Sequence, residues 1–141
     1  MKKRVETSNL NPSAVMHRET DKILFTLGNE DILYIECQPN TKLTIKEAKE
    51  STQIGGEILN HISHPLLCDL TNVTKMTQEC RKHFAGPEHA SIFSKCALIV
   101  TSPISRVIGN FFLGANKPIK PTRLFTNKEE GLNWLKNMDN V

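Results

Sequence analysis

The sequence lacks the short motifs and long apolar runs by which many functional classes are recognised. It has no CxxC pair, no HExxH, no GxGxxG or GxxxxGK loop and no nucleophile elbow. The usual signatures of zinc proteases, nucleotide-binding enzymes and serine hydrolases are therefore absent, and no cofactor is predicted. Apolar runs extend over only a few residues, so no membrane span is predicted. A large excess of charge of one sign is also missing, because the chain has 18 basic and 15 acidic residues. This small imbalance argues against nucleic-acid binding.

Cysteines are few and are not spaced as pairs. Of Cys37, Cys68, Cys80 and Cys96, three fall in predicted strands. We interpret them as small buried hydrophobic residues in a reducing compartment. The basic N-terminus is not followed by an apolar segment, so a secretory signal is not expected. We therefore expect a cytoplasmic protein.

The chain length predicts one folded domain. The protein has 141 residues, 38% of them hydrophobic, which suffices for a single core. Residues 1–20 are polar and are interpreted as a lead-in, and residues 21–141 as the domain. Alternating or continuous apolar patterns predict strands over residues 23–27, 32–37, 66–70, 96–100 and 122–125.

Helix starts are marked by capping residues. Thr44 and Glu47 have capping-box spacing, and their helix should extend to about His61, with Gly55-Gly56 allowing close approach to the sheet. Further helices are predicted over residues 77–94, 103–113 and from 126 onwards. In the third of these four helices, Ile104, Val107, Ile108 and Phe111 form the stripe expected to face the core.

The order of elements is β-β-α-β-α-β-α-β-α. Strands joined through helices require parallel crossovers, whereas the first two strands form an antiparallel hairpin. The sequence therefore predicts an α/β fold with a mixed five-stranded sheet in which the hairpin lies near one end.

This order resembles the STAS-like fold of anti-sigma-factor antagonists and sulfate-transporter tails. Residues 105–113 and 121–125 resemble an uncharacterised bacterial subgroup of that fold, and the similarity covers about residues 22–138. The resemblance implies a regulatory or protein-interaction module that is not an enzyme. It implies no particular partner, because the subgroup has no activity to carry over.

The resemblance also points to one altered position. Regulatory members have a strand ending in Asp-Leu-Ser, followed by an Asp-Ser-Ser-Gly quartet whose second serine is phosphorylated by a kinase. Here the strand ends in Asp69-Leu70-Thr71 and the quartet is Thr77-Gln78-Glu79-Cys80, so Glu79 stands at the phosphoacceptor position. Glu79 is either a constitutive mimic of the phosphorylated residue or an ordinary first-turn carboxylate. Thr77 is either another acceptor or the N-cap.

Ligands of open sheets bind beyond the carboxyl ends of the strands. Ser102, Ser105 and Arg106 form there either an anion cradle or a helix cap beside a solvated arginine. Phe112 and Leu113 lie off the predicted core stripe, and indicate an apolar interaction surface or residues covered by the next loop. The predicted rim comprises Asp69, Thr71, Asn72, Thr74, Thr77, Glu79, Ser102, Ser105 and Arg106.

The favoured interpretation is a module that docks a protein partner, or a second copy as a homodimer, through this rim and the helix beginning at Pro103. The alternative is a small-molecule or lipid carrier with an apolar pocket beneath residues 111–113 and an anion at Ser105 and Arg106. A third possibility is an enzyme that uses Asp69 and His83. His61 with His64, and Cys80 with His83, have zinc-ligand spacing. Pro65 ends the first helix in this interpretation, however, and no metal site is predicted.

Overall fold

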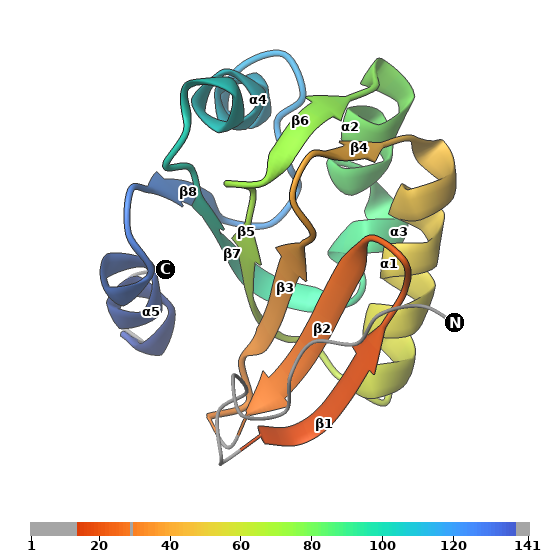
Figure 1. The fold of residues 1–141 in the computed structure, drawn as a ribbon. Helices are drawn as coiled ribbons and strands as arrows, with labels where there is room; N and C mark the ends of the chain where they lie inside the picture. Colours follow the sequence, from red (N-terminus) through yellow and green to blue (C-terminus); the bar gives the residue numbers. More distant parts are fainter. Residues whose placement is uncertain (1–13, 29, 138–141) are drawn as a thin grey trace.

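The protein is organised around a six-stranded sheet with helices on both faces (Figure 1). The computed structural model describes residues 14–28 and 30–137, so most of the expected lead-in lies outside the described residues. The strand order is β1-β2-β3-β5-β7-β8, and β4 and β6 form a separate two-stranded sheet. The strands are β1 (Ala14–Glu19), β2 (Ile23–Gly28), β3 (Leu33–Cys37), β4 (Thr41–Leu43), β5 (His64–Asp69), β6 (Val73–Met76), β7 (Phe93–Ile99) and β8 (Thr122–Phe125). The helices are α1 (Ile45–Ile58), α2 (Gln78–Phe84), α3 (Pro87–Ala90), α4 (Pro103–Leu113) and α5 (Lys128–Lys136).

The mixed sheet confirms the predicted fold class. β2 pairs antiparallel with β1 and β3, and the pairs β3–β5, β5–β7 and β7–β8 are parallel. Cys68 lies in β5 and Ile99 in β7, as the two buried apolar runs predicted. The strand count was wrong, because β1, β4 and β6 were not foreseen. β1 falls within the supposed lead-in, and β4 and β6 have only three and four residues, too few for a periodic pattern.

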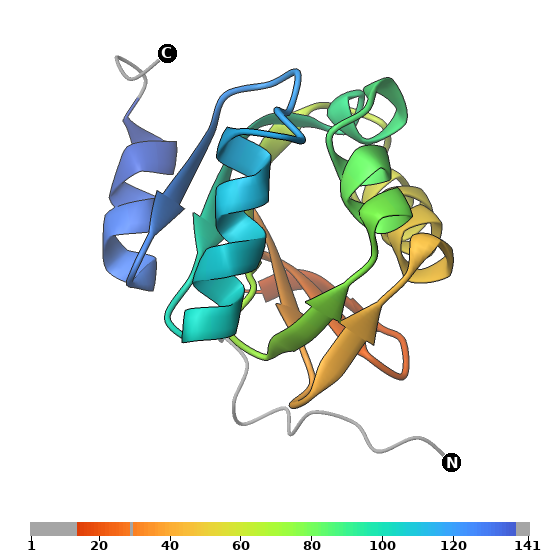
Figure 2. The same cartoon turned by 90° about the horizontal axis from the view of Figure 1, so that it is seen from above.

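Two hydrophobic cores lie on opposite faces of the sheet. The larger core joins α1, α2 and α4 to one face and includes Phe25, Leu66 and Phe112. The smaller joins α5 to the other face through Trp134 and Leu135. Figure 2 shows α4 and α5 on either side of β8, with α2 and β6 beyond α4. Within the described residues, no helix combines the length and apolarity needed to cross a membrane.

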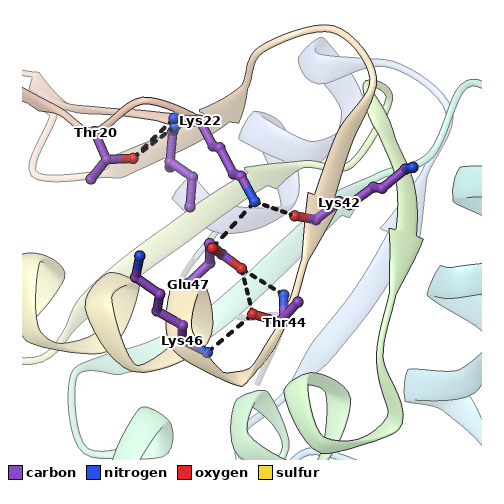
Figure 3. A network of polar contacts seen from close by, with 7 residues as sticks. Thr20, Lys22, Lys42, Thr44, Lys46 and Glu47 are labelled. Carbon is purple, nitrogen blue, oxygen red and sulfur yellow. Dashed lines mark hydrogen bonds and ion pairs between the residues drawn. The ribbon is translucent and has the colours of Figure 1, made fainter.

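The predicted capping box anchors α1 to the hairpin (Figure 3). Glu47 Oε1 accepts hydrogen bonds from the Thr44 N–H and hydroxyl, both at 2.7 Å, and Oε2 accepts one from Lys22 Nζ at 3.2 Å. Lys22 Nζ also donates to the Lys42 carbonyl at 3.0 Å. Burial alone would raise the pKa of Glu47, but the hydrogen bonds from Thr44 and Lys22 outweigh it and lower the pKa.

The end of α1 and the start of α5 differ slightly from the prediction. α1 ends at Ile58 and not at His61, because Asn60 and His61 have positive φ angles of 53° and 58°. α5 is capped by Asn127 in place of Thr126, through the N–H of Glu130. At Gly55, which was expected to allow close approach to the sheet, a Cβ would lie 3.0 Å from Ile92 Cδ1, just before β7, and 3.6 Å from Leu33 Cδ2 of β3.

Candidate functional site

The carboxyl ends of β5 and β7 bring part of the predicted rim together. Thr71 Oγ1 lies 2.7 Å from Thr101 Oγ1, and Ser102 Oγ donates to the Thr71 carbonyl at 3.3 Å. Asp69 Oδ1 accepts from the Thr71 N–H at 2.9 Å, which closes a tight turn after β5. These polar groups satisfy one another, so the rim here is a rigid junction between two loops.

The start of α4 is closed by its own serines. Ser102 Oγ accepts the Ser105 N–H at 3.1 Å, and Ser105 Oγ accepts the Ser102 N–H at 2.9 Å. Ser105 is fully buried, and its hydroxyl donates to the Ser102 carbonyl at 2.8 Å. Both hydroxyls therefore serve as caps. Arg106 alone of the supposed cradle is exposed.

The remaining rim residues follow the chain away from this junction. Asn72 Nδ2 donates to the Cys37 carbonyl at 3.0 Å, and Thr74 Oγ1 donates to the Thr41 carbonyl at 3.3 Å. These bonds tie β6 to the β3–β4 connection. β6 carries the chain roughly 13 Å further before α2 begins. Thr77 caps α2 by accepting the Cys80 N–H at 3.2 Å, and Glu79 is exposed in its first turn.

Asp69 also borders a pocket of about 230 Å³ with Glu36 and Asn72. Lys128 Nζ lies 2.6 Å from a Glu36 carboxylate oxygen and 3.9 Å from one of Asp69. His83, the other residue of the enzymatic alternative, contacts Thr52 on α1 through Nε2 at 2.8 Å. None of the residues just named contacts both Asp69 and His83. No set of three or more described residues has a metal-binding arrangement.

The orientation of α4 differs from the prediction. Ser105, Ile108, Gly109 and Phe112 face the core, whereas Ile104, Val107, Phe111 and Leu113 are 49%, 58%, 37% and 48% exposed. Only Ile108 of the expected stripe is buried, and Phe112, expected at an interaction surface, is a core residue.

Close packing explains the orientation of α4. A Cβ at Gly109 would lie 3.0 Å from both Leu124 Cδ2 and Val100 Cγ1, so the helix approaches the sheet along its small residues. Two small residues, Ser105 and Gly109, therefore share the buried face with Ile108 and Phe112.

We define the α4 face as Ile104, Val107 and Phe111. One end of this face is fixed by Arg81 of α2, whose guanidinium carbon lies 4.1 Å from the centroid of the Phe111 ring. Arg81 also donates from Nε to Asn116 Oδ1 at 3.2 Å and from Nη1 to the Met76 carbonyl at 2.8 Å. Phe111 is thus held in place although it is exposed.

A small cavity lies between the sheet and the helices, beside Phe112. Its volume is about 60 Å³, and its lining is mainly apolar apart from residues such as Ser51, Asp69 and His89. Small-molecule sites usually have volumes of roughly 300–1,000 Å³. The cavity is therefore too small for a typical carried ligand in this conformation.

His89 is the main titratable group of this region. It is 5% exposed and packs against Phe84 and Phe93, with Nδ1 2.9 Å from Thr52 Oγ1. Burial, and secondarily the charge of His83, lowers the pKa of His89 to about 3. His89 is accordingly neutral throughout the physiological range.

The cysteines are free thiols in protected surroundings. Cys68 Sγ and Cys96 Sγ lie 3.8 Å apart on adjacent strands. Burial raises the pKa of Cys37 to about 12 and that of Cys80 to about 12. A protonated, buried thiol is a poor nucleophile, so none of this favours cysteine chemistry.

The sequence matches a known protein family. A family described as domain of unknown function (DUF7793) matches residues 25–139. The chain belongs to the DUF7793 family. No curated protein matches the sequence at a significant level.

A solved structure shows the fold of this DUF7793 chain. An uncharacterised protein of the DUF3478 family from Shewanella loihica PV-4, described as having a SpoIIAA-like fold, is similar with a TM-score of 0.51 and 19% identity. The match covers 93% of this chain and 99% of the other. A protein of unknown function from Arthrobacter sp. FB24 is 30% identical, with a TM-score of 0.31, over 79% of this chain and 91% of its own. The similarity to the Shewanella protein shows that the fold is SpoIIAA-like, or STAS-like.

Proposed function

We propose that this DUF7793 protein is a non-enzymatic regulatory module that binds a protein partner through the α4 face. The observation that carries the proposal is the exposure of three large apolar side chains on a firmly packed helix: Ile104 at 49%, Val107 at 58% and Phe111 at 37%. Contiguous exposed apolar groups mark interaction surfaces. Their i, i+3, i+7 spacing is the pattern by which a helix fits a partner's groove.

The surroundings of the α4 face support a protein partner. The helix is preorganised by its capping box and by the Arg81–Phe111 contact, so little conformational entropy is lost on binding. Polar side chains of Thr71 and Thr101 lie at its beginning, and Arg106 lies on its exposed side. An apolar centre with a polar rim is typical of protein interfaces.

The position that the resemblance assigns to the phosphoacceptor bears on regulation. Glu79 is exposed in the first turn of α2, and the Thr77 hydroxyl is used as the cap. A carboxylate there is favoured by the helix dipole and has no hydroxyl group for a serine kinase to phosphorylate. We propose that partner binding in this protein does not depend on a kinase acting at this position. The cytoplasmic location is a separate prediction from the sequence.

A carrier function is the second candidate, on the observation of the cavity beside Phe112. Its volume of about 60 Å³ would have to grow several-fold to hold a drug-sized or lipid-like molecule. The anion site expected at Ser105 and Arg106 also lacks a free serine hydroxyl. Native mass spectrometry that finds a bound small molecule in the purified protein would favour this candidate.

Site-specific photo-crosslinking tests the docking proposal. A benzophenone amino acid replaces Val107 in one protein and Ile62, which is 60% exposed, in a matched control. In cells of the source organism, we expect a discrete adduct from position 107 that is absent from position 62. The adduct should disappear when Ile104→Ser and Phe111→Ser are added. An adduct between two copies would identify the partner as a second copy of the chain, in a homodimer. Equal labelling from both positions would contradict the proposal.

A further inference from the structure

A second surface lies on the other flank of α4, where a groove separates it from α5. The groove has a volume of about 510 Å³, within the range of specific binding sites. Its lining includes Arg106 and Asn110 of α4, Arg123 and Phe125 of β8, and Glu130 of α5. Figure 2 shows β8 running between the two helices.

The strand beside this groove is a sheet edge. β8 is the last strand of the six-stranded sheet, so its outer side has no strand partner among the described residues. Backbone N–H and C=O groups on such an edge can pair with an added strand. β8 is four residues long, follows Pro121 and carries Arg123, features that suppress unselective edge pairing. A selective ligand must therefore offer both an extended backbone and compensation for the positive charge.

The charge of the groove indicates what that compensation is. From Val100 to Lys128 the sequence has no Asp or Glu and five basic residues, Arg106, Lys117, Lys120, Arg123 and Lys128. Lys120 donates to the carbonyls of Ala90 and Phe93, and Lys128 pairs with Glu36.

Among the described residues, the two arginines of the groove have no such partner. Within residues 14–28 and 30–137, neither Arg106 nor Arg123 has a carboxylate within ion-pair distance. Arg123 lies 5.4 Å from the centroid of Phe125 and 5.7 Å from that of Trp134, ring contacts that leave its N–H donors available.

We infer that this groove binds an extended acidic peptide, which adds as a strand to the outer edge of β8. Neighbouring residues of a strand point to opposite sides, so two consecutive acidic residues would direct one carboxylate toward α4 and the other toward α5. The first meets Arg106 and the second meets Arg123. Glu130, at the α5 side of the groove, disfavours a further acidic residue there. The groove shares Arg106 with the polar rim of the α4 face but none of its three apolar residues, Ile104, Val107 and Phe111.

Selection from a displayed library of random octapeptides tests this inference with the complete protein as bait. We expect enrichment of peptides with two adjacent Asp or Glu residues between β-branched residues. Addition of one such peptide should shift the backbone amide resonances of residues 122–126. No enrichment of acidic pairs, or shifts confined to the α4 face, would overturn the inference.

Variants separate peptide recognition from general charge effects. The double variant Arg106→Gln with Arg123→Gln should lower the affinity for the selected peptide by about ten-fold or more, since two charge-assisted contacts are lost. Lys46→Gln with Lys49→Gln removes the same charge from exposed positions of α1 and should leave affinity unchanged. Equal weakening by both pairs would refute a specific site. Val107→Ser should not affect the peptide, so failure of the docking proposal and failure of this one are distinguishable.

The ligand's backbone provides the last test. The same peptide with N-methyl groups on alternate residues keeps its carboxylates but loses strand hydrogen bonds, and we expect at least a ten-fold loss of affinity. An unchanged affinity, or displacement of the peptide by inorganic phosphate or a single-stranded oligonucleotide at equal concentration, would identify a plain anion site and overturn strand addition.

Discussion

Protonation of His89 should make the stability of the protein strongly pH-dependent. The pKa of His89 is about 3 in the folded protein, against an ordinary value of 6.5. In the unfolded chain the ring therefore binds a proton below pH 6.5, while in the folded protein it does not. The stability that depends on neutral His89 is therefore fully present above pH 6.5. It is lost as the pH falls from there toward 3.

The size of this effect follows from the displacement of the pKa. At about pH 5, the unfolded state gains about 2 kcal/mol from protonation of this one histidine. That is a large part of the roughly 5–15 kcal/mol by which domains are stable. Glu47 and Glu57, whose pKa values are lowered, contribute mainly at more acidic pH.

Urea unfolding at about pH 7.5 and about pH 5 measures the effect. His89→Phe keeps an aromatic ring between Phe84 and Phe93 but cannot titrate, so its stability should change by about 2 kcal/mol less than that of the wild type between the two pH values. His61→Asn, at an exposed position with positive φ, is the matched control and should behave like the wild type. The reasoning is refuted if His89→Phe and the wild type lose the same free energy of unfolding.

Three further predictions concern packing, capping and thiol chemistry. Gly109→Val should destabilise the protein by about 2–3 kcal/mol in urea unfolding, because even a Cβ there would lie 3.0 Å from Leu124 and Val100; an unchanged midpoint would contradict the close approach of α4. Glu47→Ala removes three hydrogen bonds and should cost about 1–2 kcal/mol in the same assay, and a loss below a few tenths would disprove the role of the capping box. Cys37, with a pKa of about 12, should resist a disulfide reagent at about pH 8 until the protein is unfolded, and rapid reaction of the native protein would show that it is accessible.

The fold could be predicted because its main strands and caps carry local signals. Each main parallel strand contains a continuous apolar run, residues 66–68 around Cys68 and residues 96–99 up to Ile99, as expected of parallel strands covered on both faces. The Thr44–Glu47 capping box also depends only on neighbouring residues. β1 was missed because its residues include polar ones that pair at the edge of the sheet, where burial imposes little pattern.

The candidate site was harder to predict because it depends on tertiary packing. Hydrophobic periodicity placed Ile104, Val107 and Phe111 in the core beside Ile108. In the structure, Ser105, Gly109 and Phe112 take those places. Smallness can outweigh apolarity where a helix lies close to a sheet, and a single sequence does not reveal where that occurs. The groove beside β8 is lined by Arg106 and Arg123, which are 17 positions apart in the sequence. Only the fold brings them to the same groove.

Arg81 gives the protein a mechanical link between two helices. Its guanidinium contacts Phe111 at the end of α4, Asn116 in the following loop and the Met76 carbonyl just before α2. A molecule that presses on Phe111 must either stack against this guanidinium or displace it, and displacement leaves the Met76 carbonyl without that donor. The end of α4 and the chain just before the first turn of α2, where Glu79 stands, therefore share contacts with one guanidinium.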